Sequence, residues 1–433
     1  MPPMIKAIPC YTYFVVTYLG ILASACIGWL CTLFLLLVHK LETTLRTVHA
    51  AVLQSSESKG QPQEDIEVWL RNQKSIINFS FADASKPHDT LPIRAEANEN
   101  IAIAFGLINS LTTTSPSIHK SFLKTASSII NRPDRDWTAL FETATSTLKT
   151  ELNHVPGQSL PLAEVTRITC LTVVLVDNFN IPSPISRQSL VIITEEINNQ
   201  WLKAKSSTPH SRPAASSLLN GHLSSLNLTL RSSTHVLPPE EILSIIIPQY
   251  ETLWRVVLVT YLLAFHLYPS PTLPARISSV PGCLGSNSDA EKEALKLAKE
   301  GLRLTPSNKR IYRHSPTVSD HRKAKLNADL ELLHRHPSIW GPSALEFNPS
   351  RFDSLTPLQT EAYLPYSLRP HRCPAFGGFG DRMVTCLVAA MGRVLGTSGA
   401  GRVSNTNDKE GQKRQVIKTA RDKLEGWRYT LCK

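Results

Sequence analysis

Residues 363–375 read YLPYSLRPHRCPA, and FGGFG follows at 376–380 before an apolar run begins. This loop sets Cys373 among basic residues and directly ahead of an expected helix at 379–395. Both features favour a thiolate, because cationic neighbours and a helix N-terminus stabilise its charge and lower the thiol pKa. A lone cysteine before a helix is more often a small buried apolar residue. The glycines do not have dinucleotide or Walker spacing, which excludes a phosphate-binding loop.

Two segments upstream add charged residues, KEGLRLTPS at 299–307 and HRHPSIWGPSALEFNPSRF at 334–352. On a helix, Glu300 and Arg303 lie one turn apart on one face and can form an ion pair, although such pairs are common on surfaces and contribute little there. Arg351 stands among prolines and aromatics, where a packed guanidinium needs a carboxylate, and Glu300 is the candidate. The histidines at 334 and 336 do not indicate a metal site, because no further ligands have suitable spacing.

In this order and at these distances, the three segments resemble the C-terminal half of the cytochrome P-450 family. Glu300 and Arg303 match its Glu-x-x-Arg helix, and Arg351 matches the arginine of the loop that completes a structural triad. Cys373 falls on the cysteine that ligates haem iron. The resemblance covers about residues 240–395. It implies the family's mainly α fold with minor β-structure, haem b as cofactor and Cys373 as the axial iron ligand.

The cysteine loop also departs from the family pattern. Arg369 stands where the family usually has glycine, so we expect the loop to turn differently or to carry strain. His371 occupies the position of an arginine that binds a haem propionate; it can do this only as a donor, and Arg369 or Arg372 would assist it. Tyr366 replaces a phenylalanine and Ala375 replaces a glycine, which are milder changes.

The central apolar stretch at 240–267 corresponds to the family's long helix over the haem. Its acid-alcohol pair, Glu251 and Thr252, is present, and the resemblance implies that this pair delivers protons during oxygen activation. The small residues that usually precede it are absent, but Pro248 removes a helix N–H and can distort the helix. Alternatively, Glu251 simply forms a helix ion pair with Arg255, four residues on. Both interpretations stay open.

The segment from Tyr11 to Val38 carries no charge and is long enough to cross a bilayer as a helix. It is too long for a cleaved signal peptide. Lys40 and Arg46 follow it, whereas only Lys6 precedes it, which favours a cytosolic C-terminal part. We therefore expect a membrane anchor at 1–40 and a haem-binding catalytic domain at 41–433. The resemblance to eukaryotic members implies a single-pass protein of the endoplasmic reticulum membrane.

Apolar periodicity predicts helices beyond those already named. Their ranges are 95–131 with a break at 115–116, 135–152, 162–178, 185–205 and 289–304. Strand-like segments follow at 310–313 and 427–432. The segments 206–239 and 270–288 are rich in proline and serine and suggest loops, the first with short helical pieces. These patterns predict a mostly helical protein with minor β-structure near the C-terminal end of the sequence.

Composition excludes several other classes. The net charge of +11 fits a solvated basic surface, an anionic membrane or an acidic partner. Nucleic acid is not indicated, since zinc-finger spacing and basic stripes with aromatics are absent from the sequence. The cysteines lack any close pair, which excludes a zinc pattern and a disulfide framework and favours a reduced compartment; they are Cys10, Cys26, Cys31, Cys170, Cys283, Cys373, Cys386 and Cys432.

The resemblance implies a monooxygenase that inserts one oxygen atom from dioxygen into an apolar small molecule. Electrons would come from NADPH through a membrane-bound flavoprotein reductase, an acidic partner that Arg372 and Arg382 could meet. The sequence ETLWR at 251–255 is similar to fungal members of secondary metabolism, such as terpenoid or polyketide biosynthesis. The alternatives are a haem-thiolate isomerase, dehydratase or peroxide-using enzyme, and a degenerate membrane protein without activity.

Overall fold

The structure is a computed structural model that describes residues 63–82, 86–154, 159–206, 214–314, 325–396, 400–406, 417 and 420–431. The chain divides into two units, residues 1–68 and 69–433. The expected membrane anchor at 1–40, and its boundary with the catalytic domain, lie outside the described residues. All of the following concerns the second unit, apart from the first turns of one helix.

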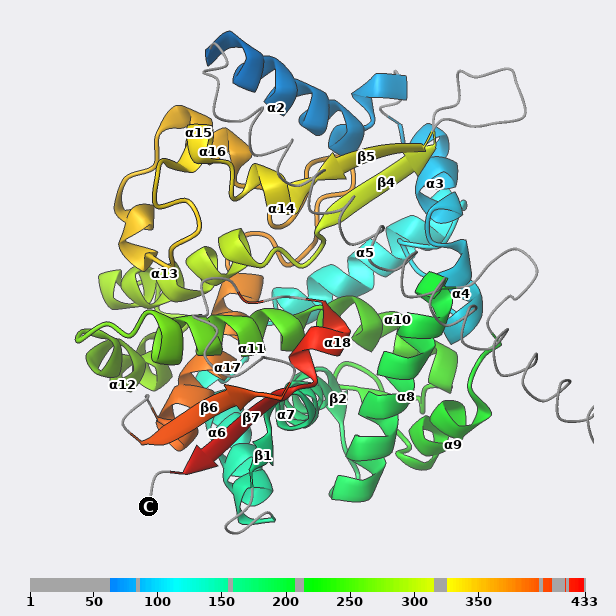
Figure 1. Ribbon diagram of the computed structural model, residues 1–433. Coiled ribbons are helices and arrows are strands. Elements are labelled where there is room, and N and C mark those ends of the chain that lie inside the picture. Colours follow the sequence, from blue (N-terminus) through cyan, green and yellow to red (C-terminus); the bar gives the residue numbers. More distant parts are fainter. Residues whose placement is uncertain are drawn as a thin grey trace, which may run out of the picture. The chain divides into compact units, whose positions relative to one another are not determined.

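Helices dominate the described chain (Figure 1). The α-helices up to the middle of the chain are α2 (Gln63–Asn78), α3 (Pro87–Glu96), α4 (Glu99–Phe105), α5 (Pro116–Ile130), α6 (Trp137–Asn153), α7 (Leu162–Asn178), α8 (Arg187–Ser206), α9 (Ser217–Ser225), α10 (Pro239–Tyr250) and α11 (Leu253–Leu262). The later ones are α12 (Leu273–Cys283), α13 (Asp289–Leu304), α14 (Leu330–Leu333), α15 (Pro337–Trp340), α16 (Pro357–Ala362), α17 (Phe379–Leu395) and α18 (Arg421–Leu424). Short 3-10 turns are η1 (Ser80–Ala82) and η3 (Pro349–Asp353), and η2 (Leu263–Leu267) is a π-helical turn that continues α11.

The strands form small antiparallel sheets. They are β1 (Leu160–Pro161), β2 (Phe179–Asn180), β3 (Thr229–Leu230), β4 (Arg310–His314), β5 (Lys325–Asp329), β6 (Gly401–Asn405) and β7 (Trp427–Leu431). One sheet has the order β1-β7-β6, and β2-β3 and β4-β5 are pairs. In the β4-β5 pair, Arg310 lies opposite Asp329 and His314 opposite Lys325. The expected mainly α fold with minor β-structure is confirmed in the described part of the chain.

Most predicted helices form close to their expected limits. The helices α7, α13 and α17 begin and end where periodicity places them. The helix predicted over 95–131 is wrong between α4 and α5, because residues 106–115 are not helical, and α5 begins at Pro116. The expectation of a loop over 270–288 is wrong, because α12 forms there. Its residues Leu273, Ile277 and Val280 are buried at helical spacing, so core burial outweighs the weak helix propensity of a segment rich in proline and serine.

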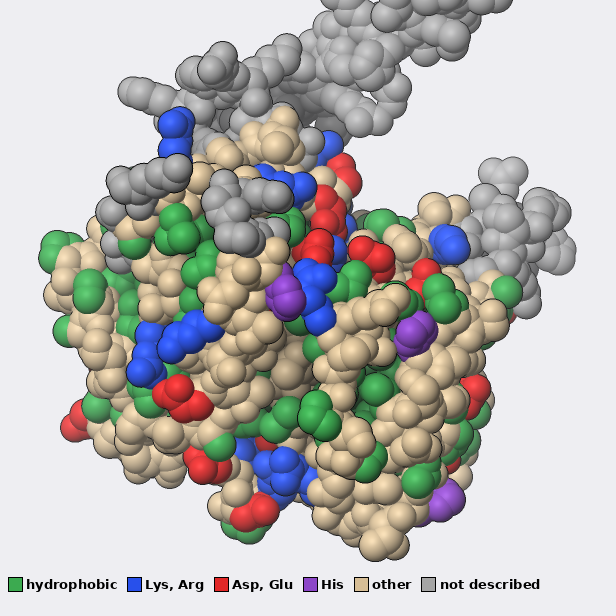
Figure 2. Space-filling view, turned by 90° about the horizontal axis from the view of Figure 1, so that it is seen from below, with side chains coloured by type: hydrophobic (Ala, Val, Ile, Leu, Met, Phe, Trp, Pro, Cys, Tyr) green, Lys and Arg blue, Asp and Glu red, His purple; other side chains and the backbone are tan. Residues whose placement is uncertain are grey.

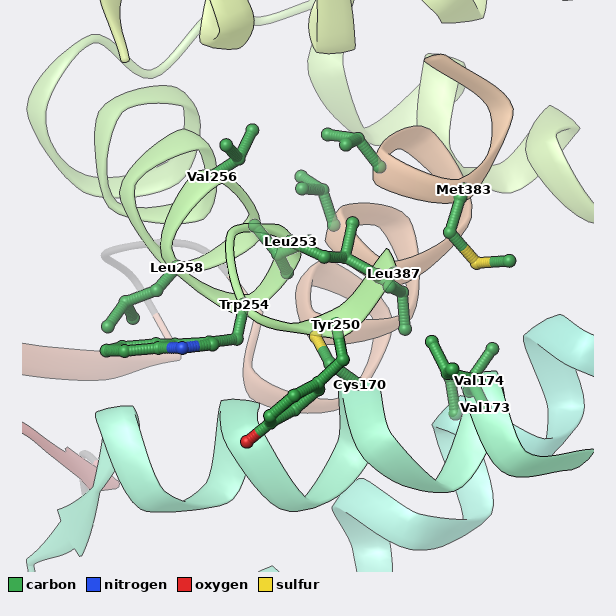
Figure 3. Close-up of a cluster of buried hydrophobic side chains, with 14 of the residues drawn as sticks. Cys170, Val173, Val174, Tyr250, Leu253, Trp254, Val256, Leu258, Met383 and Leu387 are labelled. Carbon is green, nitrogen blue, oxygen red and sulfur yellow. The ribbon is translucent and has the colours of Figure 1, made fainter. Parts of the chain in front are cut away.

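The core of the unit lies where α6, α7, α11 and α17 pack on one another. Figure 3 shows side chains of three of these elements in one cluster: Leu253 from α11, Val173 and Val174 from α7, and Leu387 from α17. Helix α13 also packs on α11 and α17. It comes very close at Gly301, where a Cβ atom would lie 2.0 Å from the Thr260 hydroxyl, so only glycine fits there.

The apolar stretch Pro239–Leu267 is the one helical segment among the described residues that is long and apolar enough to cross a membrane. It is 72% buried inside the protein, so it serves as a core helix, as its all-round apolar sequence predicts.

Charged side chains of both signs lie interspersed on the face shown in Figure 2, with hydrophobic side chains between them. On this face, the positive net charge therefore does not gather into a patch of one sign, which fits an ordinary solvated surface.

Candidate functional site

The loop before α17 presents Cys373 in a closed backbone turn. The Cys373 N–H donates to the Tyr366 carbonyl at 2.9 Å, and the Phe376 N–H donates to the Cys373 carbonyl at 3.1 Å. Ser367 takes up a positive φ of 64°, and Gly378, next to the start of α17, has φ of 112°. Arg369 is not among the residues of positive φ, so the expected unusual turn falls at Ser367 instead. A serine tolerates this left-handed conformation at modest cost.

The Cys373 side chain is accessible to solvent and yet surrounded by protein. Its accessible surface places it among exposed residues, whereas desolvation by burial raises the pKa of its thiol. The Ala375 N–H and the charge of Arg94 act in the opposite direction and lower this pKa. The prediction of a lowered thiol pKa is therefore wrong for the chain alone, because desolvation outweighs both effects.

A cluster of basic side chains lies beside this cysteine. His371, two residues before Cys373, packs edge-on against the His119 ring at 5.3 Å. Burial and the charges of Arg94, His119 and Arg313 lower the pKa of His371 to about 3. Burial likewise lowers the pKa values of Arg94 and Arg313 to about 10. We call these four residues, Arg94, His119, Arg313 and His371, the anion cluster.

The anion cluster has hydrogen-bond donors to spare. Arg94 donates to the Ser110 carbonyl and hydroxyl at 2.9 Å, and the same hydroxyl bonds His119 Nδ1 at 2.8 Å. By contrast, His371 Nδ1 and Arg313 Nε are buried without a hydrogen-bond partner among the described residues. Arg94 and Arg313 are the charged members, and neither has a carboxylate partner among the described residues, so together with the two neutral histidine rings they indicate a site for an anionic ligand.

The other basic residues of the cysteine loop do not join this cluster. Arg369 is exposed, and the guanidinium of Arg372 stacks over the Phe376 ring at 4.3 Å. Their expected help in binding a propionate stays a prediction. Arg382 is engaged by Glu291 at 2.6 Å and by Asn287 at 2.9 Å, so it is not a free cation for an acidic partner protein.

Glu300 and Arg303 form a buried ion pair with two hydrogen bonds, from Arg303 Nε to Glu300 Oε2 at 2.7 Å and from Arg303 Nη2 to Glu300 Oε1 at 2.8 Å. Both side chains are fully buried. Arg351 Nε lies 3.5 Å from Glu300 Oε1, which completes the three-residue arrangement expected from sequence. The Asn348 N–H also donates to this carboxylate at 3.0 Å.

The two arginines tie several loops to α13. Arg303 donates to the carbonyls of His334 and Ala344 at 2.7 and 2.8 Å, and Arg351 donates to the carbonyls of Trp340 and Ser343. The cysteine loop joins this network through the Leu364 N–H, which donates to His334 Nε2 at 2.9 Å. Burial lowers the pKa of His334 to about 3, so the ring stays neutral and accepts this bond. A charged scaffold therefore carries the cysteine loop.

Glu251 and Thr252, the acid-alcohol pair, lie where the central helix is interrupted between α10 and α11. Glu251 is 1% exposed and forms an ion pair with Arg421 of α18, which lies beside α11 in Figure 1. Arg255 instead donates to the Ser307 carbonyl at 3.1 Å. Glu251 therefore pairs with Arg421 and not with Arg255. Thr252 is partly exposed, so the two side chains of the pair face different surroundings.

The interruption follows Pro248 by three residues, and Pro248 itself lies inside α10. Pro248 cannot donate to the Ser244 carbonyl, and the side-chain amide of Asn109 donates to it instead at 3.2 Å. The expected distortion of this helix is present, but it falls beyond the proline.

The remaining described cysteines are buried. Cys386 is fully buried in α17, and desolvation raises its thiol pKa to about 12, as expected of an inert core residue. Cys170 and Cys283 are buried as well, and Cys432 lies outside the described residues. Among the described residues, no group of three or more histidines, cysteines and acids could hold a metal ion.

Comparison with known proteins gives a consistent result. No family model matches the chain. A cytochrome P-450 of Caenorhabditis elegans, CYP13A2, is 32% identical over 133 residues, which is 27% of this chain and 24% of that protein. Two mutant forms of cytochrome P-450SP alpha match the fold with TM-scores of 0.50, at 13% and 12% identity. They cover 77% and 79% of this chain and 85% and 88% of theirs. The chain is therefore similar to cytochromes P-450 in part of its sequence and in its fold.

The match to the C. elegans protein spans about a quarter of that protein's length, 24%. The residues around Cys373 fit the haem that the resemblance implies. The accessible sulfur of Cys373 would hold the iron, and the anion cluster would bind the propionates.

Sequence reasoning found His371 but missed its partners. Arg94, His119 and Arg313 come from α3, α5 and β4, far apart in the chain. The one available signal was the alternation of β4, where Ile311 and Arg313 are buried and Tyr312 is exposed, which is unusual for an arginine. Arg421, the partner of Glu251, had no sequence signal.

Proposed function

We propose that this chain is a cytochrome P-450, a haem-thiolate oxidoreductase that inserts one oxygen atom into an apolar small molecule. The observation that carries the proposal is the setting of Cys373, whose side chain is accessible and lies beside the anion cluster, where Arg94 and Arg313 lack carboxylate partners among the described residues. A flat cofactor with two carboxylates and an iron that takes a sulfur ligand satisfies both parts at once.

Each group of the chain then has a physical task. When bound, the haem supplies redox chemistry at iron, which a thiolate ligand turns toward O–O cleavage. The Ala375 N–H donates to the Cys373 sulfur and stabilises its negative charge. The anion cluster neutralises the propionates. Thr252 offers a hydroxyl for moving a proton on the accessible side of the interrupted helix.

The test is the spectrum of the reduced protein with carbon monoxide. Wild type should show the red-shifted Soret band of a thiolate ligand, because the sulfur donates strongly to iron. Cys373→Ser should lose this band or lose haem. Cys386→Ser, a matched change at the next cysteine along the chain, should keep it. A band that persists in Cys373→Ser would place the ligand elsewhere.

The proposed function has two versions, in which the inserted oxygen atom comes either from dioxygen or from hydrogen peroxide. The resemblance favours a monooxygenase that uses dioxygen with NADPH electrons from a flavoprotein reductase. A specific observation favours a peroxide-using enzyme: Glu251 is committed to Arg421, which leaves Thr252 without the carboxylate of its pair. Product formation with NADPH and reductase, compared with product formation from hydrogen peroxide alone, decides between them.

Thr252→Ala sharpens this comparison. If dioxygen is the oxidant, the variant should keep substrate binding but divert reducing equivalents into peroxide, because a proton donor is lost. The ratio of NADPH consumed to product formed measures this loss. An unchanged ratio would remove Thr252 from proton delivery and favour the peroxide-driven reaction.

We also infer that residues 1–40 anchor the protein in the endoplasmic reticulum membrane as a single-pass segment with the catalytic domain in the cytosol. The support is the uncharged run from Tyr11 to Val38 and the basic residues that follow it. A role in secondary metabolism rests on the resemblance of the sequence ETLWR at 251–255 to fungal members.

A further inference from the structure

Tyr366 carries a hydroxyl at a position of the cysteine loop where the cytochrome P-450 pattern has a phenylalanine. This hydroxyl donates to Asp381 Oδ1 at 2.6 Å. Such a short distance is typical of an O–H group that donates to an ionised carboxylate. Phenylalanine has the same ring without the hydroxyl, so filling this space does not by itself require a tyrosine.

Tyr366 is also joined directly to the residue that would hold the iron. Its carbonyl oxygen accepts the Cys373 N–H at 2.9 Å. One hydrogen bond and the covalent bonds of the two residues therefore connect the Cys373 sulfur with the phenol ring. The ring also makes an edge-to-face contact with Phe376, at 6.3 Å between ring centres, which fixes its orientation within the loop.

The start of α17 makes room for the phenol. A Cβ atom on Gly380 would lie 2.4 Å from the Tyr366 hydroxyl oxygen, so a side chain there would displace the ring. Gly380 precedes Asp381, and both belong to the first turn of α17. The Gly380 N–H donates to the Ala375 carbonyl at 3.1 Å, which ties this turn to the residues that follow Cys373. The loop and the helix together hold the hydroxyl against the carboxylate.

Asp381 is a buried carboxylate that forms no ion pair among the described residues. Its hydrogen bond comes from the neutral phenol of Tyr366. Two cations act on it from farther away, of which Arg382 is engaged by Glu291 at 2.6 Å and the other is Lys299. A buried charge without a counter-charge is costly, and uptake of a proton removes that charge. Burial accordingly raises the pKa of Asp381, which makes it a better proton acceptor than an exposed carboxylate.

A phenol that loses an electron also loses its proton, because the oxidised phenol is a strong acid. The proton needs an acceptor within hydrogen-bonding distance, and the Asp381 carboxylate is in place before the electron leaves Tyr366. Tyr363, in the same loop, differs in this respect. Its hydroxyl donates to the Lys299 carbonyl at 3.1 Å, and a backbone carbonyl is a much weaker base than a carboxylate. The two tyrosines of the loop therefore differ in how readily they are oxidised.

We propose that Tyr366 is a redox-active tyrosine, which returns one electron to the haem after a peroxide or peracid has oxidised the haem in the absence of substrate. The peracid takes two electrons from the haem and two protons from solvent, and leaves as a carboxylic acid and water. The O–H bond of Tyr366 then breaks. Its electron passes toward the haem through Cys373, its proton moves to Asp381 Oδ1, and a neutral tyrosyl radical remains. This activity goes beyond the proposed function, although it needs the haem that the proposed function implies.

The experiment mixes the full-length haem-loaded protein with peracetic acid in the absence of substrate, freezes the sample and records its electron paramagnetic resonance spectrum. Wild type should show the signal of a neutral tyrosyl radical. Tyr366→Phe should lower the radical yield per haem at least tenfold, and it should fold normally because the ring is kept. Asp381→Asn keeps an oxygen that accepts the hydrogen bond but does not take up the proton, so it should lower the yield at least threefold.

Tyr363→Phe is the matched control, because it removes a hydroxyl from the same loop whose partner is a backbone carbonyl. It should leave the radical yield within twofold of wild type. An unchanged yield in Tyr366→Phe would overturn the proposal, and so would a loss in Tyr363→Phe as large as that in Tyr366→Phe. An unchanged yield in Asp381→Asn would overturn the role of this carboxylate as proton acceptor.

The carbon monoxide spectrum is read on the same preparations before the peracid is added. A normal thiolate band without a tyrosyl radical refutes this inference and leaves the proposed function standing. A radical that depends on Tyr366, in a protein without that band, does the reverse. The absence of both signals refutes both.

Discussion

At the scale of single residues, Glu300 connects α13 to loops that lie far from it in the sequence. Its carboxylate accepts hydrogen bonds from the Arg303 side chain and from the Asn348 N–H, and Arg351 lies beside it. The arginines in turn bind the carbonyls of the loops between α14 and α16. An ion pair at this spacing contributes little to stability on a surface, but breaking a fully buried pair is strongly destabilising because it leaves an uncompensated charge.

Glu300→Ala should destabilise the protein by roughly 3–5 kcal/mol, because it leaves the guanidinium of Arg303 buried without its counter-charge. We expect little folded haem-loaded protein, measured as haem content per protein and as the midpoint of thermal unfolding. Glu361→Ala removes an exposed carboxylate that pairs with Lys74 at 2.9 Å, and it should have almost no effect. Normal haem content in Glu300→Ala would mean that the triad is dispensable.

At the scale of elements, the central helix and the loop after α4 depend on each other. Pro248 leaves the Ser244 carbonyl without its helical donor, and the fully buried Asn109 side chain donates to it. Asn109 also accepts the Leu111 N–H at 2.9 Å through its side-chain oxygen. The loop that carries Ser110 to the anion cluster is thereby fixed against the helix.

Asn109→Ala should lower the free energy of unfolding by about 1–3 kcal/mol, since it leaves a buried carbonyl unsatisfied. Pro248→Ala restores the missing helical N–H, so Asn109→Ala should cost less in that background. Urea unfolding of the two single variants and the double variant measures this coupling, for which about 0.5–3 kcal/mol is typical of groups in contact. Additive losses would show that Asn109 does not replace the helical donor.

At the scale of the whole molecule, the described core contains a long apolar helix of its own, Pro239–Leu267, which is 72% buried. A search for apolar segments alone would count it beside the uncharged run at 11–38. The two differ physically, since the internal helix carries Glu251 and Arg255, each of which has a polar partner inside the protein.

Deleting the residues before Lys40 should release the protein from membranes without loss of haem, because the thiolate loop and the anion cluster lie wholly in later parts of the chain. Partition of the full and truncated proteins between membrane and soluble fractions measures the release, and the Soret absorbance measures haem. Truncated protein that remains folded but has lost haem would contradict the division into anchor and catalytic domain.

The sequence by itself determined the features that neighbours along the chain control. The limits of α7, α13 and α17 follow from apolar periodicity, and the meeting of Glu300 with Arg303 follows from their spacing of three residues. The placement of Cys373 between prolines and before a helix also needs no tertiary information. The same local rules missed α12, because its composition opposes a helix that only burial stabilises.

Only the tertiary structure decided which distant charges meet. The choice of Arg421 over Arg255 as the partner of Glu251 joins residues 170 positions apart, and no periodicity marks it. The gathering of Arg94, His119 and Arg313 around His371 likewise depends on how α3, α5 and β4 pack. The sequence predicted a lowered pKa for the Cys373 thiol, whereas desolvation in the folded protein raises it. Charged neighbours can be identified from the sequence, but desolvation depends on every residue that packs around the side chain.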